Sequence, residues 1–433
     1  MSNVKKEKQV LLKVEHLEQF FKLGRKVLKA VNDVNFEIYK GEVFGLVGES
    51  GCGKTTTGRA IIRLYDITGG SVYFDGKRIC AGIRPYKQAI KNAKKKCHAE
   101  IKTYKQELKE AIDKGRDAQS EKDKYQILVK KSNEALIKVV EENTALIKSA
   151  KYDHKYCNRE FAQFEMQKVR DRFDPLIAKE KKPEKLEALN KEYKEELKLA
   201  SKDRIMNKIQ MIFQDPIASL DPRMTVRDII AEGLIIRGIK NKKYIDEQVY
   251  KILDLVGLVH EHATRYPHEF SGGQRQRIGI ARAIILNPEL VIADEPISAL
   301  DVSIQAQVIN LLRELSEKMG LTTMFIAHDL AVVKYFSDRI AVMYYGKIVE
   351  LASSDELFNH PLHPYTKSLL SAIPFPDPFF EKRRQRTVYN PLTDHELSTE
   401  EPVMREVSAD HFIYCNSAEF EKYKKELEES NPS

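Results

Sequence analysis

A glycine-rich turn near the start of the chain limits the possible folds more than any other feature of the sequence. Between Gly48 and Thr55 the residues fit the pattern GxxxxGK[ST]. The surrounding residues predict an apolar strand before the turn and a helix over residues 54–64 after it. In that order, glycines let successive backbone N–H groups face an anion, and the start of the helix adds positive potential. The sequence therefore predicts a nucleotide-binding α/β fold rather than a plain glycine turn.

This turn supplies the first candidate binding residues. Lys54 is expected to reach the β- and γ-phosphates of the nucleotide, and Thr55 is expected to bind magnesium. The complete predicted nucleotide-binding set in the turn is Gly48, Glu49, Ser50, Gly51, Cys52, Gly53, Lys54, Thr55 and Thr56.

Two acids end an apolar strand much later in the chain. Asp294 and Glu295 follow the run Leu-Val-Ile-Ala that begins at Leu290. A carboxylate is costly to bury there unless a cation or water satisfies it. We predict that Asp294 holds magnesium, usually through water, and that Glu295 is a general base that polarises the attacking water. The alternative is that both acids merely cap the end of the strand.

Three other polar features have ordinary explanations when each is taken alone. Ser271-Gly-Gly-Gln-Arg275 begins a polar helix, which makes either a simple N-cap or a second anion site. Gln214 ends an apolar strand, where it can contact magnesium or water, and His328 ends another strand, where a histidine is usually structural. Their places relative to the glycine turn and the acidic strand favour a functional role for all three.

Composition limits the class of protein. The chain of 433 residues is 42% hydrophobic, enough for a sizeable core. No apolar run reaches eighteen residues, and charges interrupt the N-terminal segment where a signal peptide would need an apolar stretch. We therefore expect a cytosolic chain. The five cysteines show no CxxC spacing, so we expect reduced thiols without zinc or disulfides.

One segment holds all of the positive charge excess. Residues 81–208 contain 33 Lys and Arg against 22 Asp and Glu, whereas the whole chain has a net charge of +8. Apolar residues recur there every three or four positions, which is typical of helices, and the predicted helix breakers are Gly115, Pro175 and Pro183. The segment is predicted to form a charged helical hairpin or short coiled coil.

The order of the motifs resembles that of ATP-binding-cassette (ABC) ATPases. Gln214, the SGGQ helix, the acidic strand, the Ser-Ala-Leu-Asp run that ends at Asp301, and His328 follow the glycine turn in the order of that family. The resemblance implies an α/β fold of the ABC-type P-loop NTPase class. Such a fold has a RecA-like core, an antiparallel β subdomain and an α-helical signature subdomain, to which this chain adds the inserted helical hairpin.

The resemblance also implies roles for individual residues, with ATP and Mg2+ as cofactors. Two cassettes of this family enclose two ATP molecules head to tail, so Ser271 and Gly273 are expected to touch the γ-phosphate held by a partner. Asp301 is expected at the seam of the dimer, and Phe21 is expected to stack on adenine. The implied sets are catalytic Lys54, Gln214, Glu295 and His328; metal-binding Thr55, Gln214 and Asp294; and nucleotide-binding Phe21, Ser271, Gly272, Gly273, Gln274 and Asp301, besides the glycine turn.

Longer stretches are similar to oligopeptide and dipeptide importer ATPases. The runs IFQDPIASLDPRMTV, HEFSGGQRQRIGIARAII and HPLHPYTKSLLSAIPFPDP carry this likeness, and Phe270 before the SGGQ run favours the F-type subunit. The likeness covers about residues 9–80 and 205–416. The predicted domains are an ABC ATPase domain at 9–82 and 205–355, the insertion at 83–204, a C-terminal extension at 356–416, and a helical or disordered tail at 417–433.

The resemblance implies an importer subunit that hydrolyses ATP to drive oligopeptide uptake. Its expected partners are a second ABC ATPase in a heterodimer, two transmembrane permeases that contact residues 217–225, and an extracellular peptide-binding protein. We expect a peripheral location on the cytoplasmic side of the cell membrane and no nucleic acid. The alternatives are an importer for dipeptides or nickel-type solutes, and a soluble ABC ATPase that acts on DNA or the ribosome.

The insertion is the departure from the family pattern, because about twenty residues are expected where this chain has about 130. It is either a solvated projection whose neighbouring ends cost little loop entropy, or a basic arm attracted to anionic lipids, or a site for a partner helix or a nucleic acid.

Overall fold

The computed structural model describes residues 9–373, 388–395 and 400–430. The first half contains β1 (Val10–Leu23), β2 (Lys26–Tyr39), β3 (Val43–Val47), α1 (Lys54–Ile61), β4 (Gly69–Phe74), β5 (Lys77–Ala81), α2 (Arg84–Asp113), α3 (Ala118–Lys179), α4 (Pro183–Ala200), the 3-10 helix η1 (Ile205–Lys208) and β6 (Ile209–Ile212). The second half contains α5 (Pro216–Ser219), α6 (Val226–Ile236), α7 (Lys242–Leu255), η2 (His260–Thr264), η3 (Pro267–Glu269), α8 (Gly272–Ile284), β7 (Leu290–Asp294), α9 (Val302–Met319), β8 (Thr322–Ala327), α10 (Leu330–Phe336), β9 (Arg339–Tyr344), β10 (Lys347–Ser353), α11 (Ser354–Asn359), α12 (Pro364–Ala372), β11 (Val403–Ser408), β12 (His411–Cys415) and α14 (Ser417–Ser430).

The larger sheet gathers the candidate site at one edge. Its strands lie in the order β11-β12-β10-β9-β3-β8-β7-β6, and the five strands from β9 to β6 are parallel. Strands β7 and β8, which the sequence predicted before Asp294 and His328, are buried along their whole length. Because parallel strands end at the same edge, the loops after β3, β6, β7 and β8 meet there.

A smaller antiparallel sheet and a group of helices complete the cassette. The small sheet has the order β2-β1-β4-β5, and its buried side chains share a hydrophobic cluster with β3, β7 and β8. Helices α6, α7 and α8 pack around another cluster that continues beneath the larger sheet. This arrangement has the RecA-like core, antiparallel β subdomain and helical subdomain that the sequence predicted.

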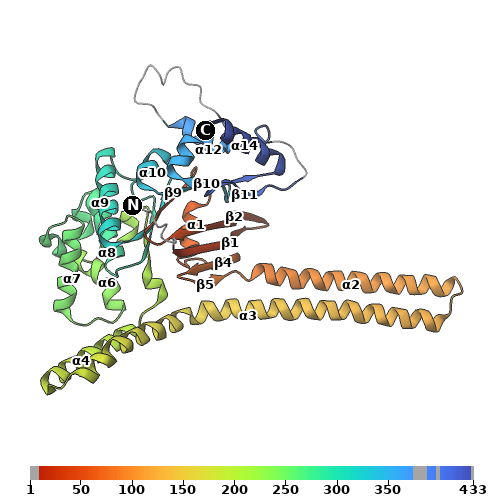
Figure 1. The fold of residues 1–433 in the computed structure, drawn as a ribbon, viewed down its shortest axis with the longest axis horizontal. Coiled ribbons are helices and arrows are strands. Elements are labelled where there is room, and N and C mark those ends of the chain that lie inside the picture. The colour runs from red at the N-terminus through yellow and green to blue at the C-terminus, as the bar shows by residue number, and fades with distance from the viewer. Residues whose placement is uncertain (1–8, 374–387, 396–399, 431–433) are drawn as a thin grey trace, which may run out of the picture.

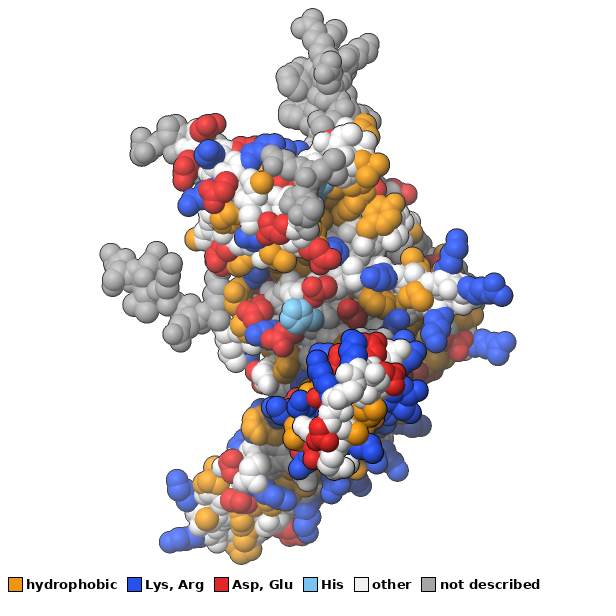
Figure 2. Space-filling view, turned by 90° about the vertical axis from the view of Figure 1, so that its right-hand side faces the viewer, with side chains coloured by type: hydrophobic (Ala, Val, Ile, Leu, Met, Phe, Trp, Pro, Cys, Tyr) orange, Lys and Arg blue, Asp and Glu red, His pale blue; other side chains and the backbone are white. Residues whose placement is uncertain are grey.

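The insertion forms a long arm made of α2, α3 and α4 (Figure 1). Helices α2 and α3 run antiparallel and pack on each other, while α4 packs against the C-terminal end of α3. The turn at Gly115 and the helix start at Pro183 agree with the predicted breakers. The arm is directed away from the body, and Figure 2, which views it from its tip, shows Lys and Arg side chains spread over its surface.

The predicted break at Pro175 is wrong, because Pro175 lies inside α3. Proline removes one backbone N–H and so frees the carbonyl four residues earlier. Here both Pro175 and Asp171 are exposed, so water can satisfy that carbonyl. The buried ring of Phe173 packs on Tyr193 of α4 with ring centroids 5.4 Å apart, which holds this part of α3 in place.

The C-terminal region closes on the edge of the larger sheet. Strand β12 pairs with β10, and β11 pairs with β12, so β11 and β12 form a hairpin at this edge. In the tail predicted to be helical or disordered, residues 417–430 form helix α14, whereas residues 431–433 and the Pro-rich run that follows Ile373 lie outside the described residues. In Figure 1 these blue elements lie on the opposite side of the body from the arm.

Candidate functional site

The glycine turn connects β3 to α1 in a conformation that requires glycine at two positions. Gly48 has φ +152° and Gly53 has φ +112°, and both values are unfavourable for residues with a side chain. A Cβ atom at Gly48 would lie 2.1 Å from the carbonyl oxygen of Met343, and one at Gly53 would lie 2.2 Å from that of Ala30. The loop is therefore packed against neighbouring backbone on both sides.

The side chain of Lys54 points back into this loop. Its Nζ donates hydrogen bonds to the carbonyl oxygens of Gly48 at 2.7 Å and Glu49 at 2.9 Å. Burial raises the pKa of the neighbouring Cys52 thiol, although the charge of Lys54 opposes this. Lys54 thus lies at the centre of the predicted phosphate-binding loop.

Thr55 and Asp294 form a pair suited to a divalent cation. The Thr55 hydroxyl donates to Oδ1 of Asp294 at 2.7 Å. Asp294 is completely buried, and its Oδ2 is a buried atom without a hydrogen-bond partner among the described residues. Burial raises the pKa of this carboxyl, partly offset by the Thr55 hydrogen bond. A buried carboxylate oxygen beside a hydroxyl has the hard oxygen chemistry that Mg2+ prefers, so these residues fit that ion.

Glu295 brings the four predicted catalytic residues together. Its Oε2 accepts a hydrogen bond from Nε2 of Gln214 at 2.9 Å and lies 3.4 Å from Nδ1 of His328. Its Oε1 lies 4.0 Å from Nζ of Lys54. Gln214, His328 and Lys54 follow β6, β8 and β3, so the edge of the sheet brings them together at Glu295.

The backbone at Glu295 is strained. Its φ is +42°, in the left-handed region that a non-glycine residue adopts at a cost of order 1–3 kcal/mol. Its N–H donates to the carbonyl oxygen of Ile326 at 3.0 Å, and this bond fixes the turn after β7 against β8. The turn thereby directs the carboxylate toward Gln214 and His328.

The predicted second anion site is built as a capped helix start. The Ser271 hydroxyl accepts from the N–H of Gln274 at 3.4 Å, and the Gln274 side chain accepts from the N–H of Ser271 at 3.1 Å. Gly273 packs closely on Ile304, since a Cβ there would approach it to 2.5 Å. Among the described residues, no hydrogen bond or ion pair joins Ser271–Gln274 to the glycine turn of the same chain.

Two other predicted residues lie away from the four catalytic side chains. Asp301 precedes α9 at its N-cap position, is exposed and makes no capping hydrogen bond there. Phe21, near the end of β1, packs edge to face on Tyr65 with ring centroids 5.4 Å apart. Adenine stacking on Phe21 stays a prediction.

The sequence reasoning missed Tyr365, which connects the C-terminal region to the glycine turn. The Tyr365 hydroxyl accepts a hydrogen bond from the backbone N–H of Glu49 at 3.0 Å, and the residue is only 2% exposed. Its ring packs on Tyr344 and Tyr389 with centroids 4.4 and 5.5 Å away. The only sequence signal was the tyrosine within HPLHPYTKSLL, a run noted for its family likeness and not for a role.

Two known family patterns match this chain. The pattern of the ABC transporter family matches residues 31–173 and 175–298, which is more than half of the chain. A second pattern, described as the oligopeptide/dipeptide transporter C-terminal region, matches residues 349–396.

Individual relatives match over almost their whole length. The oligopeptide transport ATP-binding protein OppF of Bacillus subtilis (strain 168) is 45% identical over 415 residues, 95% of this chain and 98% of that protein. The dipeptide transport ATP-binding protein DppF of Lactococcus lactis subsp. cremoris (strain MG1363) is 41% identical over 423 residues, 97% of this chain and 98% of that protein. A solved dimeric ATP-binding cassette bound to ADP and phosphate covers 79% of this chain and 99% of its own, at 20% identity and a TM-score of 0.47.

Proposed function

The chain belongs to the ABC transporter ATP-binding proteins that carry the oligopeptide/dipeptide C-terminal region, and from this premise we propose that it drives oligopeptide uptake across the cell membrane by hydrolysing ATP. The observation that carries the proposal is the meeting of Lys54, Gln214 and His328 at the carboxylate of Glu295. The cargo follows from the C-terminal pattern and from OppF, the first of the two relatives.

The proposed chemistry assigns each side chain a task in an in-line displacement. Lys54 and the backbone N–H groups of the glycine turn hold the phosphates, and Glu295 polarises the attacking water. Gln214 and His328 orient the Glu295 carboxylate, and His328 contacts the γ-phosphate. Thr55, Asp294 and Gln214 would hold Mg2+, which supplies neutralising charge to the phosphates.

The proposed assembly explains why the SGGQ helix is built away from the glycine turn. Ser271 and Gly273 serve the nucleotide held by a second ABC ATPase, with Asp301 at the seam. Two permeases and an extracellular peptide-binding protein complete the importer. No helix in the described residues is long and apolar enough to cross a membrane, so we propose attachment through the permeases, on the cytoplasmic side.

The loop after Gln214 is the proposed permease contact. Within residues 217–225, Ile217 is 66% exposed, so its apolar side chain is free to contact a permease. In this proposal the domain at 9–82 and 205–355 hydrolyses ATP, and the extension at 356–416 supports the glycine turn. Dipeptide uptake is the second candidate, favoured by the 41% identity to a dipeptide transport protein.

Glu295→Gln tests the chemistry. It should leave ATP binding within a few-fold of normal and lower turnover by about 10²-fold or more, because a general base contributes 10²–10⁴-fold. Glu289→Gln is the matched control, since Glu289 lies before β7 and pairs with Lys208 at 3.3 Å on the surface. Both variants are assayed for nucleotide binding and for ATP hydrolysis in the complex with the permeases. Normal hydrolysis by Glu295→Gln would remove Glu295 from the role of base.

Uptake by the reconstituted complex tests the cargo. Vesicles that contain the chain, its partner ATPase, the permeases and the binding protein are given labelled oligopeptides, dipeptides or nickel with ATP. ATP-dependent accumulation of oligopeptides supports the proposal. Accumulation of dipeptides or nickel alone would replace it with the corresponding alternative.

A further inference from the structure

Helix α2 has one face that carries only positive charge. Residues 84–105 contain eight Lys and Arg against one acidic residue, Glu100. Six of the lysines recur every three or four positions, so at about 3.6 residues per turn they fall within an arc of about 100° around the helix axis. We call this face the α2 stripe, and it consists of Lys87, Lys91, Lys94, Lys95, Lys102 and Lys105.

The stripe faces solvent and its charges are not compensated within the chain. Helix α2 packs on α3 through the side that buries Cys97 and Ala111, more than about 100° around the axis from the centre of the stripe. Glu100 lies on that packed side, where it accepts a hydrogen bond from the Ser132 hydroxyl at 2.7 Å and lies 3.9 Å from Lys96. All six stripe lysines are exposed, and none forms an ion pair within 4 Å in the described part of the chain.

Helix α3 shows that this is not a general property of the arm. Residues 118–151 of α3 contain seven Lys against five acidic residues. Several of these charges pair with each other: Lys124 lies 2.8 Å from Glu121, and Lys130 lies 4.0 Å from Glu134. Because α3 is equally helical and equally solvated, solvation alone does not account for the one-sided charge of α2.

The chemistry of the stripe suits a flat anionic surface better than a nucleic acid. The stripe runs straight for about 27 Å along the helix, so all six amines can reach one plane. Lysine is a point charge without the planar fork with which arginine reads bases. The two aromatic side chains of this stretch, Tyr86 and Tyr104, are half-buried on the side that packs on α3 and cannot stack on bases.

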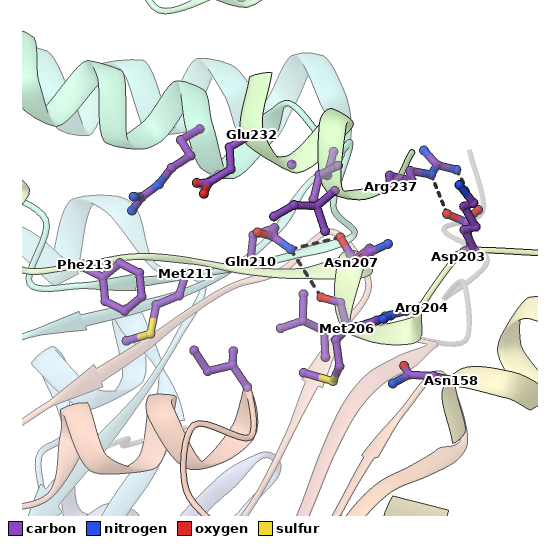
Figure 3. Close-up of a pocket in the computed structure, with 18 of the residues that line it drawn as sticks. Asn158, Asp203, Arg204, Met206, Asn207, Gln210, Met211, Phe213, Glu232 and Arg237 are labelled. Carbon is purple, nitrogen blue, oxygen red and sulfur yellow. Dashed lines mark hydrogen bonds and ion pairs between the residues drawn. The ribbon is translucent and has the colours of Figure 1, made fainter. Parts of the chain in front are cut away.

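The position of the arm also favours a membrane. The groove in Figure 3 is lined by α3 between Asn158 and Met166 and also by Ala218 and Ser219, which belong to the proposed permease contact. The arm therefore leaves the cassette next to the loop that is proposed to meet the membrane subunits. The C-terminal region lies on the opposite side of the body (Figure 1).

We propose that the α2 stripe binds the anionic lipid headgroups of the bilayer around the permeases. The nearness of a bilayer rests on the proposed function, whereas the charge of the stripe does not. Lysine stems are long and flexible, so their amines can extend from the helix to headgroup phosphates. Clusters of four to eight basic residues on one helix are sufficient for such attraction. The insertion then gives the ATPase a second attachment to the membrane besides the permeases.

Vesicle flotation with the purified full chain tests the proposal. The vesicles consist of phosphatidylcholine alone or of phosphatidylcholine with phosphatidylglycerol. The wild-type chain should float with the anionic vesicles and not with the neutral ones, and added salt should release it because exposed charges are screened. A stripe variant with Lys91→Gln, Lys95→Gln and Lys102→Gln should lower the partition coefficient by about tenfold or more.

Two further variants separate the stripe from total charge. Lys130→Gln, Lys138→Gln and Lys148→Gln remove the same charge from exposed positions on the side of α3 that faces away from α2, so this variant should bind within about twofold of the wild type. Arginine at the three altered stripe positions keeps the charge and should restore binding. Thermal melting shows whether each variant is folded, and the salt dependence of the wild type needs no variant.

Three results would overturn the proposal. The first is equal binding of the wild type to neutral and anionic vesicles. The second is an equal loss in the folded stripe variant and the folded α3 variant, which would assign binding to total charge. The third is release of the chain from anionic vesicles by RNA or duplex DNA at an equal phosphate concentration, which would identify a nucleic acid as the preferred partner. Because no permease is present, each of these results leaves the proposed importer function standing, and the uptake assay tests that function separately.

Discussion

Arg63 and Arg78 hold the insertion to the cassette from the surface, whereas Glu350 and Tyr365 hold the C-terminal region from within. Arg63 reaches Sγ of Cys157 at 3.2 Å, and Arg78 reaches Asp153 at 2.6 Å with both side chains partly exposed. Glu350, by contrast, is fully buried. The polar contacts that join the two regions to the ATPase core therefore differ in burial, and Cys157 and Phe161 of α3 also enter the hydrophobic cluster of the small sheet.

The buried attachment is a chain of polar contacts that leads to the glycine turn. Glu350 accepts from the N–H groups of Leu362 at 2.8 Å and His363 at 3.1 Å, and it lies 2.9 Å from Nε2 of His411. Two residues after His363, the Tyr365 hydroxyl meets Glu49. The C-terminal region therefore contacts the glycine turn, whereas in the described residues the arm meets the core near its base.

Removing one carboxylate charge from each attachment gives the largest expected difference. Glu350→Gln should cost about 3–5 kcal/mol, because it leaves buried groups without their charged partner. Asp153→Asn, the equivalent change on the arm, should cost less than about 1 kcal/mol, as is usual for a partly exposed pair. Denaturant unfolding followed by circular dichroism measures both. Equal losses would show that the two attachments do not differ in strength.

Tyr365→Phe tests the contact between the C-terminal region and the glycine turn. Loss of the hydroxyl leaves the N–H of Glu49 without its partner and should weaken ATP binding by about fivefold, or about 1 kcal/mol. Tyr389→Phe is the control, because its hydroxyl contacts His395 at 2.7 Å and not the glycine turn. Titration with a fluorescent ATP analogue measures both variants. Unchanged affinity in Tyr365→Phe would disconnect the C-terminal region from the site.

Two histidines should respond to pH in opposite directions. Burial alone would lower the pKa of His411, but Glu350 and Glu356 outweigh it and raise the pKa above 6.5. Its stabilising effect is therefore complete below about pH 6.5 and is lost as the pH rises through the folded pKa. Burial lowers the pKa of His154 on the arm, with Arg63 adding to the effect, so its effect on stability is unfavourable at low pH and disappears by about pH 6.5.

Unfolding midpoints from pH 5 to pH 9 measure this contrast. The unfolding midpoint of the wild type should exceed that of His411→Gln by less as the pH rises above about 6.5. The unfolding midpoint of the wild type should instead rise relative to that of His154→Gln as the pH rises toward 6.5. The change should be smaller, because His154 lies near the surface. A difference that is constant with pH in the His411 pair would contradict the proposed role of Glu350.

The smallest expected effect comes from shortening the arm. Residues 103–128 are excised and the helices rejoined by a short Gly-rich turn, near where Cys97 of α2 meets Asn133 of α3. ATP hydrolysis and permease recovery should stay within about twofold of normal, because the contacts of the arm with the core begin near Ser149. A large loss of either would show that the tip is functional.

Local chemistry decided what the sequence could predict. Each motif, such as the glycine turn or the Asp294–Glu295 pair, spans only a few residues and can be read locally. Parallel strands then bring the motifs to one edge of the sheet. The meeting at Glu295 was therefore predictable. Tyr365 was not, because its partner Glu49 is 316 positions away and the hydrogen bond depends on how the C-terminal region packs.

The structure of the insertion could also be predicted only in part. Its helical periodicity predicted the hairpin, but the continuation through Pro175 depends on solvent exposure and on the contact of Phe173 with Tyr193. A groove between the arm and the core is lined by residues of α3, β6, α6 and α8, and no sequence motif indicates that these elements meet.

The length of α3 gives the arm a mechanical consequence. From Cys157, where Arg63 fastens it, to its start at Ala118, the helix extends about 60 Å. Because the helix is fixed to the cassette at one end, a rotation of the cassette by about ten degrees would move its tip by roughly 10 Å. A probe at the tip of the arm would therefore convert a small rotation of the cassette into a displacement that spectroscopy resolves easily.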